Sequence, residues 1–397
     1  MDLSLPLAIW LVAAALTSAL VPLSRVIATK AGALDYPGHR KIHAQPMPRM
    51  GGIAVFASFT TLVLGGFLFL PIMLETPWVS TSLRSAVGPL SGAGDVQGRL
   101  IALLLGATTV FGVGLLDDLL GERFPVWLKA LGQLLGALIL VMGGGVTTSF
   151  LPYEWMNVVV TLLWLVGITN AFNLLDNMDG LSAGVALVAC GILFVNACLR
   201  GEYFIALIFA AFMGSLAGFL FFNFKPASVF LGDCGSLFIG FMMGALTLLE
   251  RYVSHSSSSL FPILMPVVVL AVPIVDTATV IAIRLYERRP IYVGDSRHLS
   301  HQLVALGFSQ RSAVLIIYAV TACLGLGAFS LVDATLAQSL SILFQVVGFV
   351  GLMLTLMFGV PRLQPALARQ PANLVSVREP RPPMAKSRPG RVVHATG

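Results

Sequence analysis

The chain has 397 residues, of which 57% are hydrophobic and only 11% are charged, and its formal net charge is +6. Because soluble domains carry about 25% charged residues, this composition excludes a soluble globular protein and predicts an all-α integral membrane protein. The positive balance does not by itself indicate a nucleic-acid partner, since membrane proteins concentrate Lys and Arg on their cytoplasmic side.

Long apolar runs predict about ten to eleven membrane-spanning helices, because a helix needs about 20 apolar residues to cross the bilayer. Arg25 and Lys30 follow the first run instead of preceding it, the reverse of a signal peptide, so we expect a retained first helix. The candidate spans cover residues 4 to 23, 52 to 71, 100 to 116, 130 to 147, 155 to 171, 181 to 199, 203 to 222, 234 to 250, 260 to 283, 312 to 331 and 338 to 358.

The distribution of Lys and Arg predicts how these spans are oriented. With the N-terminus outside, all but four of the 24 basic residues fall in cytoplasmic loops or in the C-terminal segment. The exceptions are Arg84, Arg99, Arg200 and Arg251. This asymmetry follows the positive-inside rule and predicts a cytoplasmic C-terminus.

The chain divides into two parts. Residues 1–360 hold all candidate spans and are expected to form one polytopic transmembrane domain. Residues 361–397 are rich in Pro and Arg without an apolar period, which predicts a disordered basic tail on the cytoplasmic side. The cysteines lie in or beside spans without a CxxC pair, which argues against disulfides and a zinc site; they are Cys190, Cys198, Cys234 and Cys323.

Polar residues gather where spans meet the cytoplasm. The acids are Asp117 and Asp118 in "GLLDDLLG", Asp176 and Asp179 in "NLLDNMDG", and Asp233 in "VFLGDCGS". Basic residues at the same boundary are Lys41 and His43 in "HRKIHAQPMPRMGG", Lys129, and His298 and His301 in "GDSRHLSHQ". Such distant segments can meet only if the helix ends surround one space, so we expect an active-site cleft at the cytoplasmic face.

The residue types indicate the chemistry of this cleft. Carboxylates are ligands that Mg²⁺ prefers, and Mg²⁺ is usually held by one or two of them together with substrate phosphates. Basic side chains and glycine-rich turns suit the phosphates themselves. Asn170, Asn173 and Asp176 recur every third residue and so stay within about 120° of one another on a helix. The pattern therefore predicts a phosphorylated substrate and a bound Mg²⁺.

Each acid also has an alternative explanation. Asp117 and Asp118 are what a solvated helix end would show. Asp176, Asp179 and Asp233 precede predicted helices, which they could cap by accepting hydrogen bonds from the first backbone N–H groups. The histidines could be interfacial residues without a chemical role. The occurrence of five acids at one boundary of so apolar a chain favours a shared site.

Six blocks in order carry a resemblance. The segments "RKIHAQPMPRMGG", "GLLDDLLG", "TNAFNLLDNMDGLSAG", "VFLGDCGSLFIGF", "VPIVDT" and "DSRHLSHQLVALGFS" resemble the signature blocks of the polyprenyl-phosphate N-acetylhexosamine-1-phosphate transferases. The resemblance implies a multi-pass enzyme of a bacterial inner membrane. It implies transfer of a sugar 1-phosphate from a UDP-sugar donor to undecaprenyl phosphate, with Mg²⁺ (or Mn²⁺) and release of UMP. The oligomeric state stays open, with a homodimer as one alternative.

The resemblance also implies roles for individual residues. Catalytic roles are implied for Asp117, with its neighbour Asp118, and for His298 and His301. Asp233, together with Asp176, is implied as a metal ligand. Substrate binding is implied for Lys41, His43, Lys129, Asn170, Asn173, Asp179 and Arg297.

The first block resembles that of the undecaprenyl-phosphate N-acetylglucosamine-1-phosphate transferase branch. The alternative is the phospho-N-acetylmuramoyl-pentapeptide transferase branch, which would show a "GTPTMGG"-like turn and three consecutive histidines. Relatives usually read His-Leu-His-His-Arg where this chain has Ser300 and Gln302 within "HLSHQ". This departure bears on which amino sugar is accepted.

A transporter is the alternative from another class. Asp276 lies inside the ninth predicted span, where an ionisable residue is functional by default, although a structural partner on a neighbouring helix explains it equally well. Transporters place their sites near the membrane midplane between internal repeats. Here the acids lie at one surface and no repeat is visible, which favours the enzyme.

Overall fold

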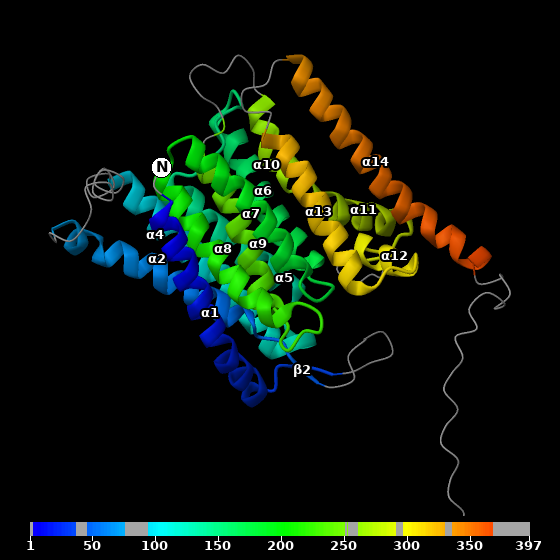
Figure 1. Ribbon diagram of the computed structural model, residues 1–397, viewed down its shortest axis with the longest axis horizontal. Helices are drawn as coiled ribbons and strands as arrows, with labels where there is room; N and C mark the ends of the chain where they lie inside the picture. The colour runs from blue at the N-terminus through cyan, green and yellow to red at the C-terminus, as the bar shows by residue number, and fades with distance from the viewer. Residues whose placement is uncertain are drawn as a thin grey trace, which may run out of the picture.

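The computed structural model describes residues 3–36, 46–75, 94–250, 252, 261–290, 297–329 and 336–367. Within these ranges the chain is a bundle of helices with one two-stranded sheet (Figure 1). Ten of the helices are long and apolar enough to cross a membrane. The prediction of an all-α integral membrane protein with about ten to eleven spans is confirmed.

The helices follow one another in chain order. Their bounds are α1 (Ser4–Ala31), α2 (Gly52–Glu75), α4 (Gly94–Leu120), α5 (Val126–Leu138), α6 (Glu154–Leu175), α7 (Leu181–Leu199), α8 (Tyr203–Asn223), α9 (Gly232–Leu249), α10 (Met265–Val269), α11 (Ala271–Tyr286), α12 (Leu299–Ala305), α13 (Gln310–Phe329) and α14 (Leu336–Leu367). Short 3₁₀ turns at Gly121–Arg123 and Phe261–Leu264 and a π turn at Ile139–Gly143 complete the helical structure.

The segment predicted as the ninth span, over 260 to 283, is not one continuous helix. It consists of the 3₁₀ turn Phe261–Leu264, α10 and α11, with a break at Leu270. Pro273 lies in the first turn of α11. Because proline has no backbone N–H and disfavours a helical residue before it, a helix that continued through Leu270 would lose a hydrogen bond there.

The most deeply buried candidate span is α9, which lies inside the bundle (Figure 1). Glycines allow its neighbours to approach. A side chain at Gly52 of α2 would overlap the backbone of Gly235, and one at Gly114 of α4 would overlap the backbone of Asp233. Small residues serve this purpose in membrane helix packing. The N-terminus of α9 is therefore held at close range by two other helices.

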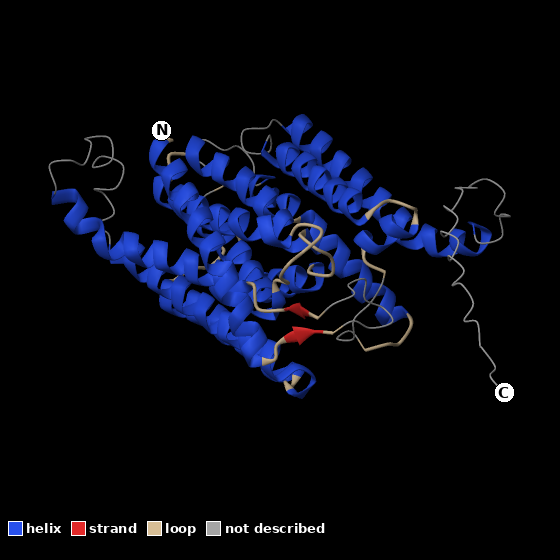
Figure 2. Cartoon of the chain, turned by 60° about the horizontal axis from the view of Figure 1, so that its bottom comes forward, coloured by secondary structure: helices blue, strands red, loops and turns tan. Residues whose placement is uncertain are grey.

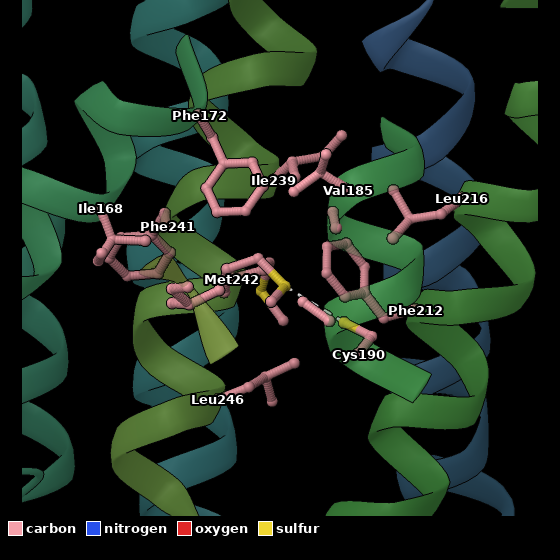
Figure 3. Packing of buried hydrophobic residues seen from close by; sticks show 14 of the residues in the cluster. Ile168, Phe172, Val185, Cys190, Phe212, Leu216, Ile239, Phe241, Met242 and Leu246 are labelled. Carbon is pink, nitrogen blue, oxygen red and sulfur yellow. Dashed lines mark hydrogen bonds between the residues drawn. The ribbon is translucent and has the colours of Figure 1, made fainter. Parts of the chain in front are cut away.

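Large apolar side chains fill the space between α6, α7, α8 and α9 (Figure 3). Phe172, Phe212 and Met242 are fully buried there. The Cys190 thiol lies 3.2 Å from the sulfur of Met243, and all four cysteines are free, as their positions predicted. This dry core fixes the helices below the polar end of the bundle.

The small sheet ties the start of α2 to the start of α9. Its strands β1 (Leu34–Asp35) and β2 (Met47–Pro48) are antiparallel and lie with several loops at the end of the bundle away from the N-terminus (Figures 1 and 2). Phe230 donates its N–H to Pro48 O at 2.8 Å, and Gly52 donates to Leu231 O at 2.8 Å. The loop that leads into Asp233 is thereby held by the first polar block.

The last helix runs past the predicted domain boundary. The boundary at 360 stays a prediction, and α14 runs across it from Leu336 to Leu367. It packs on α12 and α13 at the outside of the bundle (Figure 1). The rest of the predicted tail, residues 368–397, lies outside the described residues.

Candidate active site

A cavity of about 580 Å³ opens at the polar end of the bundle. Its walls come from the sheet region, the α6–α7 connection, the loop before α9, and α12. Residues of four predicted blocks line it, among them Arg49, Asn173, Asp176, Asp179, Asp233 and His301. The expectation that helix ends from distant parts of the sequence surround one cleft is met.

Lys129 joins two of the predicted acids at the edge of the cavity. Its Nζ lies 2.8 Å from Asp117 Oδ2 and 3.2 Å from Asp233 Oδ1. Asn173 donates from Nδ2 to the same Oδ1 atom of Asp233 and, at 2.8 Å, to Ser236 Oγ. Asp233 is therefore fixed by α5 and α6 through one oxygen. Its other oxygen, Oδ2, lies 3.9 Å from Arg49.

Asp118 has a different position from its neighbour. Its two oxygens accept hydrogen bonds of 2.9 Å from the backbone N–H groups of Asp233 and Cys234, the first residues of α9. The residue is 6% exposed, and its carboxylate suits the positive end of the helix dipole. Asp118, predicted as catalytic, is here a cap that holds the N-terminus of α9 beside Asp117.

The glycine before Asp233 makes this cap possible. Gly232 has φ +76°, a left-handed conformation that favours glycine, and a side chain there would overlap Arg49 O and approach Asp118 Oδ2. The "LGDCGS" block therefore supplies both the turn and the acid that follows it.

Asp176 ends α6 and lines the cavity. Burial, and after it the negative charges of Asp233 and Asp118, raise the pKa of Asp176 to about 8. The carboxyl group therefore holds a proton at neutral pH as long as no cation balances its neighbours. The raised pKa reflects the burial of Asp176 first and the negative charge of its neighbours second.

Asp179 contacts two residues of a neighbouring loop. Its Oδ2 lies 3.2 Å from Lys225 Nζ and accepts the N–H of Ala227 at 3.2 Å. Both partners belong to the loop between α8 and α9. Asp179, predicted to bind substrate, closes this side of the cavity by tying two loops together.

The histidine motif divides between a buried pair and the cavity. His298 Nδ1 lies 2.6 Å from Asp276 Oδ2, and Leu299 donates its N–H to Asp276 Oδ1 at 2.7 Å. Asp276 is 1% exposed, so it is a structural partner of α12, the second of the two explanations given by the sequence. His301, one turn further along α12, lines the cavity.

Two other predicted substrate residues have side-chain partners. Arg297 makes two contacts with Glu287, of 2.5 and 2.8 Å. Asn170 pairs with Gln133 through both amide groups. Among the described residues, the lining of the cavity includes Asn173 but neither Arg297 nor Asn170. Lys41 and His43 lie outside the described residues.

The donor set fits a divalent cation. Carboxyl groups outnumber cations around Asp233: the acids are Asp117, Asp118, Asp176 and Asp233, and the cations are Lys129 and Arg49. No three acid, histidine or cysteine side chains of the described ranges converge as a complete metal cage. A cation here would be held by one or two carboxylates, water and substrate phosphate, the usual arrangement of Mg²⁺.

Sequence reasoning missed three residues of the cavity. Arg49 lies within 4.0 Å of Asp35, 3.7 Å of Asp118 and 3.9 Å of Asp233; its place in "PRMGG" was the available signal. Lys225 lies in the loop before α9. Asn177 accepts from Ser300 Oγ at 2.6 Å, so the serine that departs from the usual motif bonds directly to a cavity residue.

Fold and site together define an integral membrane enzyme whose polar cleft lies at one end of a helical bundle. The model of glycosyl transferase family 4 matches residues 100–250. The chain is 36% identical over 339 residues to a probable undecaprenyl-phosphate N-acetylglucosaminyl 1-phosphate transferase of Bacillus subtilis, covering 83% of this chain and 86% of that protein.

Two further relatives show lower identity. The chain is 33% identical over 333 residues to a decaprenyl-phosphate N-acetylglucosaminephosphotransferase of Mycobacterium tuberculosis, with 77% of each chain covered. It is 32% identical over 245 residues to a phospho-N-acetylmuramoyl-pentapeptide-transferase of Limosilactobacillus fermentum, covering 58% of this chain and 69% of that protein. The chain belongs to glycosyl transferase family 4, in the branch of the undecaprenyl-phosphate N-acetylglucosamine-1-phosphate transferases, which confirms the resemblance.

Proposed function

We propose that this protein transfers N-acetylglucosamine 1-phosphate from a UDP-sugar to undecaprenyl phosphate, giving a lipid-linked diphospho-sugar and UMP. The observation that carries the proposal is the convergence of Asp117, Lys129 and Asn173 on Asp233 at the edge of the cavity. The relatives named as polyprenyl-phosphate N-acetylglucosamine-phosphate transferases support the same activity. The product would be the first lipid-linked intermediate of a cell-envelope polysaccharide.

We propose Mg²⁺ as the cofactor, with Mn²⁺ as a substitute. Asp233 and Asp176 would hold it together with the donor diphosphate, and the proton on Asp176 would be displaced when the cation binds. When bound, such a cation neutralises the negative charge of the diphosphate and of the leaving phosphate. Excess acid around Asp233 supports this assignment.

The acceptor needs little activation. A phosphate monoester has a second pKa near 6, so it is mainly a dianion at pH 7. Its oxygen would attack the phosphorus that bears the sugar, a new P–O bond would form, and the bond to UMP would break. Lys129 and Arg49 would offset the negative charge that the two phosphates bring together. Asp117 would orient the attacking phosphate or remove a residual proton, because phosphoryl transfer depends mainly on positioning and electrostatics.

We place the enzyme in a bacterial inner membrane with its N-terminus outside and its cleft in the cytoplasm, where a nucleotide sugar is available. The distribution of basic residues supports this orientation. A cysteine introduced at Arg289 should react with an impermeant thiol reagent only from the cytoplasmic side, and one at Ser257 only from outside. Labelling of both from the same face would contradict the orientation.

The direct test is UMP release by the purified protein. UDP-N-acetylglucosamine and a polyprenyl phosphate should give UMP and a lipid-linked sugar diphosphate only when Mg²⁺ or Mn²⁺ is present. UDP-N-acetylmuramoyl-pentapeptide as the preferred donor would assign the protein to the other branch. Full turnover in excess chelator would remove the metal from the proposal. No UMP from any donor of a panel would contradict the proposal as a whole.

A further inference from the structure

An amide pair lies between α5 and α6 just inside the cluster around Asp233. Gln133 Nε2 donates to Asn170 Oδ1 at 3.3 Å, and Asn170 Nδ2 donates back to Gln133 Oε1 at 2.5 Å. Asn170 Nδ2 also donates to Val166 O at 2.8 Å. Gln133 is only 2% exposed. Both the oxygen and the nitrogen of the Asn170 amide are therefore hydrogen-bonded within the protein.

The pair lies one helical turn from two residues of the site. Gln133 is four positions after Lys129 on α5, and Asn170 is three positions before Asn173 on α6. Residues at these spacings share one face of a helix. Lys129 and Asn173 both donate to the same oxygen, Oδ1 of Asp233. The position of that oxygen relative to both donors therefore depends on how α5 lies against α6.

A buried amide pair specifies one register between two helices. An amide left without a partner in an apolar environment costs free energy. If α5 slid or rotated against α6, both Gln133 and Asn170 would lose their partner at once. Apolar contacts between two helices impose no such condition, because an apolar side chain can exchange one apolar neighbour for another. The pair thus selects the arrangement in which Lys129 and Asn173 converge.

We propose that Gln133 and Asn170 act as a positioning pair that sets the register of α5 on α6 and so places Lys129 and Asn173 on Asp233. This proposal rests on the proposed transferase function. It replaces the expectation that Asn170 binds substrate, since the Asn170 side chain is occupied by Gln133 and the cavity lining, within the described residues, does not include it.

Leucine substitutions separate a positioning role from substrate binding. Gln133→Leu and Asn170→Leu should each lower kcat for UMP release by about tenfold or more, because a small misplacement of reacting groups has a large kinetic effect. The KM for the UDP-sugar should stay within about twofold of wild type, because neither residue touches the donor. The double variant should be no slower than the slower single variant, since one interaction is lost in all three.

A matched control removes another hydrogen bond of the same helix. Trp164 of α6 donates from Nε1 to Thr247 Oγ1 of α9 at 3.0 Å, further from the cluster. Trp164→Phe should leave kcat near wild type. Each single leucine variant leaves the other amide without its partner and should therefore melt at a lower temperature in detergent, whereas the double leucine variant leaves neither amide of the pair in place and should melt nearer to wild type. The kcat should fall in all three pair variants, so the loss of kcat should not follow the loss of stability.

An exchange of the two side chains covers the case in which leucine prevents folding. Gln133→Asn alone shortens one partner and should lower kcat, whereas Gln133→Asn combined with Asn170→Gln restores the combined length and should recover most of the loss. Wild-type UMP release is measured first, because its absence would contradict the transferase function and not the pair. If wild type is active, any of three results would contradict the positioning role of the pair: unchanged kcat in the single variants, no recovery of kcat in the exchange, or a KM for the UDP-sugar raised tenfold by Asn170→Leu alone.

Discussion

An acid lies at each end of α9, but the surroundings of the two acids differ. At one end Asp233 shares an oxygen between Lys129 and Asn173 and lies beside further carboxylates at an open cavity. At the other end Glu250, directly after α9, is 4% exposed. Its two oxygens accept from Asn196 Nδ2 at 2.7 Å and from the Tyr252 hydroxyl at 3.1 Å.

The two acids differ in burial, in the charge around them and in the space beside them: the Asp233 side chain is 23% exposed, whereas Glu250 is buried. Burial raises the pKa of Glu250 to about 8, so this acid is neutral at pH 7 and each oxygen has a neutral donor. Both oxygens of this group are thus hydrogen-bonded to neighbouring side chains of the protein. Around Asp233, charged groups of both signs remain next to a cavity. A buried acid therefore indicates a site only when its neighbours leave charge unbalanced and space open.

The largest effect is expected from substitutions at the Asp233 end of α9. Asp233→Asn and Asp117→Asn should each lower kcat by at least about a hundredfold, or about 2.7 kcal/mol of transition-state stabilisation. Asp233→Asn should also weaken the apparent Mg²⁺ affinity, whereas Asp117→Asn should change the donor KM little. The rate of UMP release at varied Mg²⁺ and donor concentrations measures these quantities. Glu250→Gln is the control at the other end of α9. Near-wild-type turnover with intact detergent stability would assign the chemistry to other carboxylates.

A smaller effect distinguishes the adjacent acids Asp117 and Asp118. Asp118 accepts two backbone N–H groups at the start of α9, so Asp118→Ala should destabilise the protein by about 1 to 2 kcal/mol, the usual cost of a lost helix cap. Asp117→Asn should leave the melting temperature in detergent near wild type. Equal melting temperatures for wild type and Asp118→Ala would show that the cap does not hold α9.

The smallest effect concerns the pH dependence at Glu250. Its pKa is about 8 in the folded protein against an ordinary value of 4.5, so the folded form binds the proton more tightly. The stabilisation is complete below about pH 4.5 and is lost as the pH rises through about 8. Between about pH 6 and pH 9 the melting temperature of wild type should therefore fall more than that of Glu250→Gln. Parallel curves for the two proteins would mean that Glu250 is ionised in the fold.

Sequence patterns predicted the spans because the length of an apolar run depends only on consecutive residues. The break of the helix within the ninth span was not predicted, because it depends on Pro273 and on how α10 and α11 pack. Asp117, Asp176 and Asp233 could be assigned to one cleft because helix ends on one side of a membrane have little room to separate. The different positions of Asp117 and Asp118 could not be predicted, since adjacent residues on a helix point about 100° apart and only the packing of α9 decides which one caps it.

The partners of polar side chains were equally beyond sequence reasoning. Nothing local to Asn170 reveals that Gln133, on another helix, occupies its amide. The same holds for Asp276, which the sequence placed within a span and the fold pairs with His298. Such contacts arise from tertiary packing between helices that are separated along the chain.

The most direct test of the account is Mn²⁺ binding to the purified protein, followed by electron paramagnetic resonance, for wild type, Asp233→Asn and Glu250→Gln. We expect wild type and Glu250→Gln to bind Mn²⁺ with the same affinity, and Mg²⁺ to displace it. Asp233→Asn should weaken binding by about tenfold or more, because one charged ligand is lost. Equal Mn²⁺ affinity in all three proteins would contradict a cation site at the Asp233 end of α9.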